Sequence, residues 1–322
     1  MTGTTELPFC RRLSRSGLFL LFLPLYLFTD FMKRINFIVR TLTGVLFVAL
    51  VLGSIFYGPV AYTALFLLVA CLTSRELAGL LEAHAECHMN RNMHALMTFF
   101  IVAGSAAWAN ETLSVFFAPC FALFFVLLLT VMLDEIRHNR ADSMNSIFYQ
   151  IFVQAYVSVP FSLLITLPYS VGGFHNQVYS WHAPLALFLM LWASDTGAYC
   201  VGSLIGKHKL APAVSPGKTW EGSLGGLLTT VCVGLLMAFY FPFQELDSMT
   251  GSLAWVALAI LVCVAGTMGD LVESLIKRHL GIKDSGNVLP GHGGLLDRFD
   301  SMLFAAPLAF LFFLLLGTCC NF

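Results

Sequence analysis

The stretch Gly269–Asp300, which reads GDLVESLIKRHLGIKDSGNVLPGHGGLLDRFD, lies between two long apolar runs, and the rest of the chain is organised around it. Only 11% of the 322 residues are charged, yet this stretch contains Lys277, Arg278, Lys283, Arg298, Asp270, Glu273, Asp284, Asp297 and Asp300. Asp270, Glu273 and Lys277 are spaced at i, i+3 and i+7, which predicts that they share one face of a helix. A carboxylate at membrane depth costs roughly 2.5–3.5 kcal/mol on insertion scales, so Asp270 and Glu273 are functional candidates.

The second half of the stretch predicts a glycine turn that leads into a helix. The turn Pro290-Gly291-His292-Gly293-Gly294 offers backbone N–H groups, and the next helix should carry Asp297 and Asp300 near its start. A glycine turn before a helix N-terminus is suited to bind phosphate, and paired carboxylates are suited to bind hard cations. The alternative is an ordinary solvated loop between two membrane helices, which the carboxylates inside the preceding helix disfavour.

The composition is that of a polytopic helical membrane protein. Hydrophobic residues make up 58% of the chain, phenylalanine alone accounts for 30 residues, and the mean hydropathy is +0.82. A soluble globular domain does not have this composition. The nine cysteines are scattered and are interpreted as small core residues. His84, Cys87 and His88 lack a second pair of ligands, so no zinc site is predicted there.

Nine apolar stretches are predicted to span the membrane: 41–57, 59–81, 93–109, 115–133, 147–168, 183–204, 222–243, 252–276 and 300–318. Residues 1–31 are predicted to be an N-terminal extension, either upstream of a true start at Met32 or a peripheral segment, because cations flank the short apolar run Leu18–Phe28 on both sides. Residues 32–170 are expected to form a transmembrane scaffold, and residues 171–322 a second transmembrane region that carries the site.

The positions of the basic residues orient these spans. When the loops are assigned alternately to two sides, all 14 Lys and Arg residues after residue 31 fall on one side. Basic residues are enriched in cytoplasmic loops, so this side is predicted to be cytoplasmic. It includes the N-terminus, the loop between the sixth and seventh spans, and the stretch Gly269–Asp300, while the C-terminus lies on the opposite side.

Two further polar features are predicted on the cytoplasmic side. The sixth span carries Asp195, which is either a functional carboxylate or a structural partner of a lysine. The following loop, Gly206–Gly222, is basic and punctuated by glycine. Its Gly217-Lys218-Thr219 triplet is not a Walker A loop, because residue 212 is proline where that motif needs glycine. Lys218 and the N–H groups at the next helix start are still suited to bind phosphate.

The run Ser274–Asp300 closely resembles the diagnostic motif of phosphatidate cytidylyltransferases, which are also called CDP-diacylglycerol synthases. Asp195–Tyr199 and Ser215–Gly222 resemble segments of that family as well, so the resemblance covers roughly residues 185–318. Glu76 lies where members of the family often have a glutamate at the end of the second span. The resemblance implies an all-α polytopic membrane enzyme, with residues 171–322 as its catalytic region and with cytoplasmic catalytic loops.

The reaction that the resemblance implies joins CTP to phosphatidic acid and releases CDP-diacylglycerol and pyrophosphate, with Mg²⁺ as the cofactor. The phosphate nucleophile is already anionic, so no strong general base is needed, and the main difficulty is the repulsion between two polyanions. Basic side chains and metal ions around the reacting phosphates would reduce that repulsion. A second cation beside Mg²⁺ remains an open alternative.

The implied roles are distributed over the charged residues of both loops. Asp270 and Asp297 would be the principal metal ligands, supported directly or indirectly by Glu273, Asp300 and Asp195. The predicted catalytic set comprises Asp270, Asp297, Lys277, Arg278 and Arg298. The predicted substrate-binding set comprises Asp195, Lys218, Lys283, Asp284, His292, Gly293 and Gly294.

Two alternatives would use these residues differently. A CTP-dependent lipid-alcohol kinase also needs nucleotide and metal at a membrane surface, and its lipid product distinguishes it. An ion-coupled transporter would use Asp195, Asp270 and Glu273 as an intramembrane pathway, and would need that pathway to continue to the opposite side. The expected location is the inner (cytoplasmic) membrane. The expected partners are CTP, phosphatidic acid and the bilayer, without nucleic acid, and a homodimer is left open.

Overall fold

The computed structural model describes residues 41–85, 87–138, 143–171, 178–243, 246–286 and 293–319. The predictions for residues 1–31 and for His292 fall outside these ranges. The elements follow in this order: the helix Thr41–Tyr57, α2 (Pro59–His84), α3 (Arg91–Trp108), η1 (Glu111–Phe116), α4 (Phe117–His138), α5 (Ser143–Val153), η2 (Gln154–Ser158), α6 (Val159–Thr166), η3 (Leu167–Tyr169), α7 (His182–Ile205), β1 (Lys209–Ala211), β2 (Ser215–Thr219), α8 (Trp220–Tyr240), α9 (Ser248–His279) and α10 (Leu296–Cys319).

Helices occupy all nine predicted spans within the described ranges. Seven of them are long and apolar enough to cross a membrane by length and composition: Pro59–His84, Thr112–His138, Ser143–Tyr169, His182–Ile205, Trp220–Tyr240, Ser248–His279 and Leu296–Gly317. Thr41–Tyr57 is a shorter apolar helix, and the 18-residue α3 is not among the seven. The all-α polytopic class is therefore supported, while the number of nine crossings stays a prediction.

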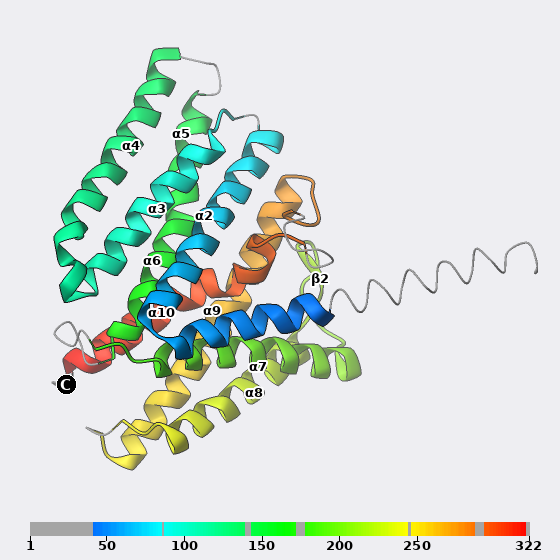
Figure 1. Ribbon diagram of the computed structural model, residues 1–322. Coiled ribbons are helices and arrows are strands. Elements are labelled where there is room, and N and C mark those ends of the chain that lie inside the picture. Colours follow the sequence, from blue (N-terminus) through cyan, green and yellow to red (C-terminus); the bar gives the residue numbers. More distant parts are fainter. Residues whose placement is uncertain are drawn as a thin grey trace, which may run out of the picture.

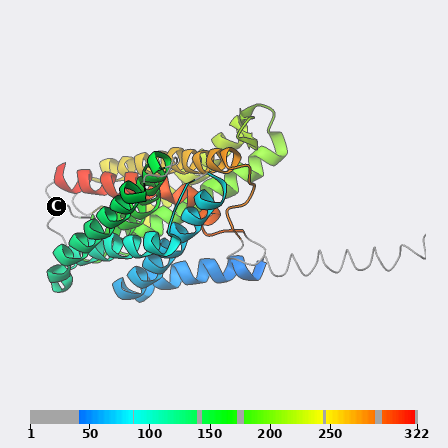
Figure 2. The ribbon, with the colours of Figure 1, turned by 90° about the horizontal axis from the view of Figure 1, so that it is seen from above.

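The helices form two groups that meet at α10 (Figure 1). The helices α3, α4, α5 and α6 lie on one side, and α7 and α8 lie together on the other. The helix α10 contacts α6, α7 and α9, and it runs beside α9 in both views (Figures 1 and 2). A site on the facing sides of α9 and α10 therefore lies within the predicted catalytic region, next to the scaffold helix α6 that contacts α10.

An aromatic cluster fixes the first turns of α10 in the core. Phe299 is 1% exposed, and its ring centroid lies 5.5 Å from that of Phe47, 5.6 Å from that of Phe161 and 6.2 Å from that of Phe66. These partners come from the first helix, α6 and α2, so one side chain joins four helices. Edge and tilted ring contacts at this spacing are favourable. Because Phe299 lies between Asp297 and Asp300 in the sequence, this anchor also restricts where those two carboxylates can lie.

The loop between α7 and α8 contains a small hairpin that the all-α prediction did not include. The strands β1 and β2 pair antiparallel, with Lys209 opposite Thr219 and Ala211 opposite Ser215. The hairpin leads into α8, whose N-cap Thr219 accepts a hydrogen bond from Gly222 N at 3.1 Å. Figure 1 shows β2 at the same end of the molecule as the C-terminal end of α9. The two loops predicted to form the site are therefore neighbours.

Candidate functional site

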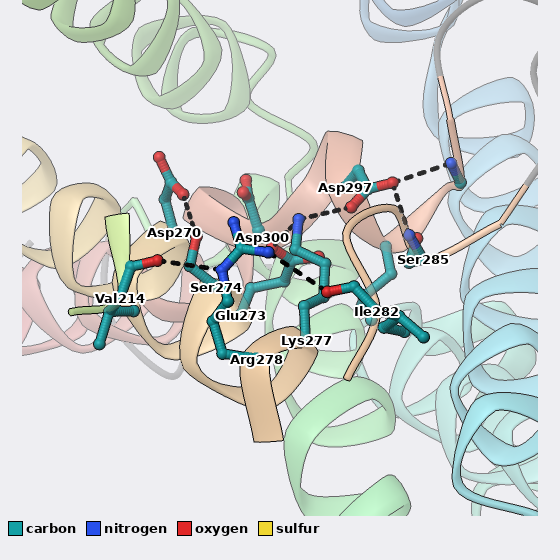
Figure 3. Close-up of polar contacts among 12 residues, drawn as sticks. Val214, Asp270, Glu273, Ser274, Lys277, Arg278, Ile282, Ser285, Asp297 and Asp300 are labelled. Atoms are coloured by element: carbon teal, nitrogen blue, oxygen red, sulfur yellow. Dashed lines mark hydrogen bonds and ion pairs between the residues drawn. The ribbon is translucent and has the colours of Figure 1, made fainter. Parts of the chain in front are cut away.

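The face of α9 that the sequence spacing predicts is present in the structure (Figure 3). Glu273 is fully buried, and its Oε2 forms an ion pair with Lys277 Nζ at 2.6 Å. Asp270 lies one turn earlier and accepts a hydrogen bond from Ser274 Oγ at 3.3 Å. A buried carboxylate needs such a partner, because desolvation of an unpaired charge is costly.

The helix α10 brings a third carboxylate to the two on α9. The two helices approach so closely at Gly269 that a Cβ there would lie 2.5 Å from the backbone carbonyl oxygen of Asp300. Small residues permit this kind of approach between membrane helices. Asp270, Glu273 and Asp300 each offer a carboxylate oxygen, and these oxygens lie within 4.8 Å of one another. We call these three residues the carboxylate cluster.

Asp297 lies beside the cluster but is held by other groups. Its Oδ1 accepts a hydrogen bond from Lys277 Nζ at 2.8 Å, so this lysine joins α9 to α10. Its Oδ2 accepts from the backbone N–H groups of Ser285 and Gly294, both at 3.0 Å. The sequence-based prediction paired Asp297 with Asp270 as principal metal ligands. The structure instead groups Asp270 with Glu273 and Asp300, and the role of Asp297 as a ligand stays a prediction.

The hairpin contributes a second lysine to the carboxylate cluster: Lys218 pairs with Asp270, whereas Lys277 pairs with Glu273. Lys218 Nζ lies 2.7 Å from Asp270 Oδ2 and donates to the carbonyl oxygen of Thr267 at 3.3 Å. Lys218 and Asp270 line a cavity of about 520 Å³ between α7, the hairpin, α8 and α9, and Asp195 lines it as well. The structure thus brings two predicted substrate-binding residues, Asp195 and Lys218, to the same cavity as Asp270 of the carboxylate cluster.

The cavity has the size and polarity of a ligand site. Pockets that hold small ligands usually measure about 300–1,000 Å³ and combine apolar walls with a few polar groups. Hydroxyl groups of Ser194, Ser203, Ser223 and Ser301 lie among its lining residues, along with glycines of α7 and α8. Tyr199 also lines the cavity and is 77% exposed, so the opening adjoins an apolar outer surface of the helix bundle.

The other predicted residues lie around this centre rather than in it. Arg278 is exposed and donates to the carbonyl oxygens of Val214 and Ile282, both at 3.4 Å (Figure 3). This links the end of α9 to the hairpin. Lys283 and Asp284 are exposed in the loop after α9, and Arg298 is exposed in the first turn of α10. Gly293 has a φ of +81°, and the N–H group of Gly294 is already used by Asp297.

Two residues from outside the predicted sets also belong to the surroundings of the site. Glu76 of α2 accepts hydrogen bonds from Ser285, in the loop after α9, and from Leu295 and Leu296, where α10 begins. Tyr156 of η2 is 8% exposed and interacts electrostatically with the three carboxylates of the cluster. Sequence spacing cannot find either contact, because both join helices that are far apart in the chain.

The cluster has the chemistry of a hard-cation site. Carboxylate oxygens are the preferred ligands of Mg²⁺ and Ca²⁺. Lys218 and Lys277 are paired with Asp270, Glu273 and Asp297, which leaves the combined group of four carboxylates with more negative than positive charge. Carboxylates this close repel one another, and a divalent cation would relieve that repulsion. The residues present therefore fit a metal ion, whose identity the ligand set does not fix.

Fold and site together define a class of protein: a polytopic membrane protein with two carboxylates and a lysine lining a cavity, next to further carboxylates and a second lysine. Such a site is suited to bind phosphate groups together with a hard cation.

Comparisons with known proteins then identify the family. Residues 38–316 match the model of the cytidylyltransferase family. The chain is 34% identical over 284 residues to a phosphatidate cytidylyltransferase of Staphylococcus haemolyticus (strain JCSC1435), covering 84% of this chain and 96% of that protein. It is 33% identical over 273 residues to one of Staphylococcus saprophyticus, with the same coverage, and 40% identical over 189 residues to one of Staphylococcus aureus (strain COL), covering 58% and 65%. The chain therefore belongs to the cytidylyltransferase family, as the resemblance at Ser274–Asp300 predicted.

Proposed function

We propose that this protein is a phosphatidate cytidylyltransferase that transfers the cytidylyl group of CTP to phosphatidate. A phosphate oxygen of phosphatidate attacks the α-phosphorus of CTP, and the bond between that phosphorus and the bridging oxygen to the β-phosphorus breaks. The electron pair leaves with pyrophosphate, and CDP-diacylglycerol is the lipid product. The attacking oxygen is an anion, so the protein has no proton to remove from it.

The single observation that carries this proposal is the shared cavity of Lys218, Asp195 and Asp270, in a chain of the cytidylyltransferase family. Phosphoryl and nucleotidyl transfer depend mainly on positioning and on stabilisation of charge. Lys218 offers an ammonium group to the phosphates, and Ser203, Thr219 and Ser223 also line the cavity. The cavity thus combines donors for an anionic substrate with carboxylates for a cation.

Mg²⁺ is the cofactor that this proposal implies, and Asp270, Glu273 and Asp300 are the residues that would hold it. When bound there, it would supply charge stabilisation for the phosphates and the departing pyrophosphate. Lys277 holds Glu273 and Asp297 in place on the other side of the cluster. Arg278, Lys283 and Arg298 are exposed at the end of α9, in the loop after it and at the start of α10, where their charges would attract polyanionic CTP.

The apolar edge of the cavity supports a lipid as the second substrate. Tyr199, Leu204 and Trp220 are 77%, 82% and 58% exposed, and they lie on α7 and α8 beside the cavity residues. Exposed aromatic and aliphatic side chains at the membrane boundary are suited to contact with the acyl chains of lipids. Phosphatidate could therefore present its phosphate to the cavity from the bilayer, while CTP arrives from the water.

The proposed orientation places the site on the cytoplasmic face of the inner membrane. The hairpin loop, which carries Lys207, Lys209 and Lys218, lies at the same end of the molecule as the C-terminal end of α9, which carries Lys277 and Arg278 (Figure 1). Positive residues favour the cytoplasmic side. Nucleoside triphosphates such as CTP are present in the cytoplasm, so this orientation gives the site access to its nucleotide substrate. The alternatives of a lipid-alcohol kinase and of an ion-coupled transporter are not favoured by the relatives.

The proposal is tested with the full chain purified in detergent and supplied with CTP labelled in its α-phosphate. Addition of phosphatidate and Mg²⁺ should move the label into a lipid that co-migrates with CDP-diacylglycerol, and pyrophosphate should appear in equal amount. A parallel reaction contains diacylglycerol and CTP labelled in its γ-phosphate. Label transferred to diacylglycerol, with none transferred to phosphatidate, would show a kinase and refute the proposal.

A further inference from the structure

The carboxylate of Glu76 fastens the loop after α9 and the start of α10 to the helix α2. Its Oε2 accepts a hydrogen bond from Leu295 N at 2.9 Å, and its Oε1 accepts from Leu296 N at 3.3 Å and from the hydroxyl group of Ser285. Ser285 precedes the loop segment 287–292, whereas Leu295 and Leu296 follow it. One side chain from the predicted scaffold region therefore holds both ends of the predicted catalytic loop.

The chain is shaped to receive this carboxylate. A Cβ at Gly294 would lie 1.9 Å from Glu76 Oε1 and 2.0 Å from Ser285 Oγ, so a larger residue cannot occupy this position without displacing them. A Cβ at Gly286 would lie 3.1 Å from Glu76 Cδ. Glycine permits such close approach of the backbone to another group. The close approach of Gly286 and of Gly294 to Glu76 indicates that its carboxylate occupies a specific binding position rather than an incidental surface contact.

The bonds to Glu76 act on the part of α10 that carries the site carboxylates. The N–H groups at the start of a helix have no partner within the helix, and a negative charge beside them is favourable. Charge-assisted hydrogen bonds are also shorter and stronger than neutral ones. Leu296 is the first residue of α10, Asp297 follows it, and Asp300 lies one turn later. Any shift of Leu296 is therefore passed on to both aspartates.

Glu76 and Asp297 hold the same two segments from different sides. Asp297 Oδ2 accepts from the N–H groups of Ser285 and Gly294, while Glu76 accepts from the Ser285 hydroxyl group and from Leu295. Loss of Glu76 would leave the Ser285 hydroxyl group and the N–H groups of Leu295 and Leu296 without this acceptor in a partly buried place, and a buried donor without a partner is destabilising. The segment would keep its two hydrogen bonds to Asp297 Oδ2 but would lose the bonds that tie it to α2.

We propose that Glu76 is a positioning residue that sets the place of Asp297 and Asp300 through the first turn of α10. It acts on the carboxylate cluster from a distance, because both of its oxygens are used by donors of the loop and of α10. This proposal rests on the proposed function only in treating the cluster as the metal site. The helix α2 is accordingly part of the working site and not merely scaffold.

The test compares Glu76→Gln with Glu82→Gln in the purified full chain. Glu82 is on the same helix and pairs with the exposed Arg91 outside the site, so it is a matched control. Glutamine keeps the size of Glu76 but loses its charge and replaces one acceptor by an NH₂ donor. Mn²⁺ serves as the probe, and its binding is followed by electron paramagnetic resonance without substrate. The concentration of Mg²⁺ at half-maximal activity and the folded fraction are measured in parallel.

Glu76→Gln should weaken Mn²⁺ binding and raise the half-saturating Mg²⁺ concentration at least five-fold, with a ten-fold or larger fall in kcat per folded molecule. The control Glu82→Gln should match the wild-type protein in Mn²⁺ affinity, in the half-saturating Mg²⁺ concentration and in kcat. Ser285→Ala, which removes one of the three donors, should give a smaller shift in the same direction even if Glu76→Gln folds poorly. A loss of activity proportional to the loss of folded protein, with unchanged metal dependence, would overturn the proposal. Failure of the wild-type protein to form CDP-diacylglycerol would refute the proposed function instead, while the Mn²⁺ result would still decide the role of Glu76.

Discussion

Replacing Lys277 with methionine should destabilise the contact between α9 and α10. Lys277 Nζ lies 2.6 Å from Glu273 and 2.8 Å from Asp297, and the side chains of these partners are 0% and 12% exposed. Methionine keeps much of the apolar length of lysine but removes its charge. The substitution therefore leaves Glu273 buried without its ion-pair partner.

The expected size of the effect follows from these exposures. Removal of one partner of a buried ion pair costs about 3–5 kcal/mol, because the remaining charge stays desolvated. Asp297 keeps the N–H groups of Ser285 and Gly294, so most of the loss should come from Glu273. We expect Lys277→Met to lower the free energy of unfolding by about 3 kcal/mol. The double variant Lys277→Met/Glu273→Gln should regain more than half of that loss, because the unpaired charge is gone.

The assay is equilibrium unfolding in mixed micelles, followed by tryptophan fluorescence. Arg91→Met is the control, since it breaks the exposed pair of Arg91 and Glu82 and should cost less than about 1 kcal/mol. Equal stability of Lys277→Met and Arg91→Met would refute the reasoning. So would a double variant that is no more stable than Lys277→Met, because the loss would then not arise from the stranded charge of Glu273.

Three further predictions concern topology, the N-terminus and helix packing. A reporter fused after Phe322 should be periplasmic and one inserted near Gly286 cytoplasmic, and a topology assay that finds both on one side would disprove the nine-span arrangement. A chain that starts at Met32 should insert and act as well as the full chain in a membrane assay, whereas a large loss would make residues 1–31 a working part. Gly269→Ala should separate α9 from α10 at Asp300 and reduce both thermal stability and Mn²⁺ binding, and wild-type values for both would contradict the close approach.

Local spacing predicted those parts of the site that lie on one element. The common face of Asp270, Glu273 and Lys277 follows from the period of a helix, and the ion pair of Glu273 with Lys277 confirms it. The apolar runs also predicted the positions of the helices, because a membrane helix needs about 20 apolar residues. Lys218 was found as a cation at a helix start, and it lies in the same cavity as Asp270.

The rest of the site depends on contacts between distant elements. The sequence did not indicate that Asp300, rather than Asp297, joins Asp270 and Glu273, because both aspartates lie in the first turns of α10. That choice depends on the close approach at Gly269, on the anchoring of Phe299 and on the backbone donors that occupy Asp297. The bonds of Glu76 to Leu295 and Leu296 join positions 219 and 220 residues apart. Periodicity carries no information about such pairs.

The most direct test of the carboxylate cluster is the rate of CDP-diacylglycerol formation by Asp270→Asn. Asparagine keeps the size of aspartate but lacks the charge that a hard cation needs. The variant should fold normally and lose on the order of a hundredfold to a thousandfold in turnover, the scale for removal of one electrostatic stabiliser. Asp134→Asn, at the exposed end of α4, is the control and should be close to wild type. Raised Mg²⁺ should restore part of the activity of Asp270→Asn, whereas a folded Asp270→Asn protein with full activity at low Mg²⁺ would contradict the metal-site assignment.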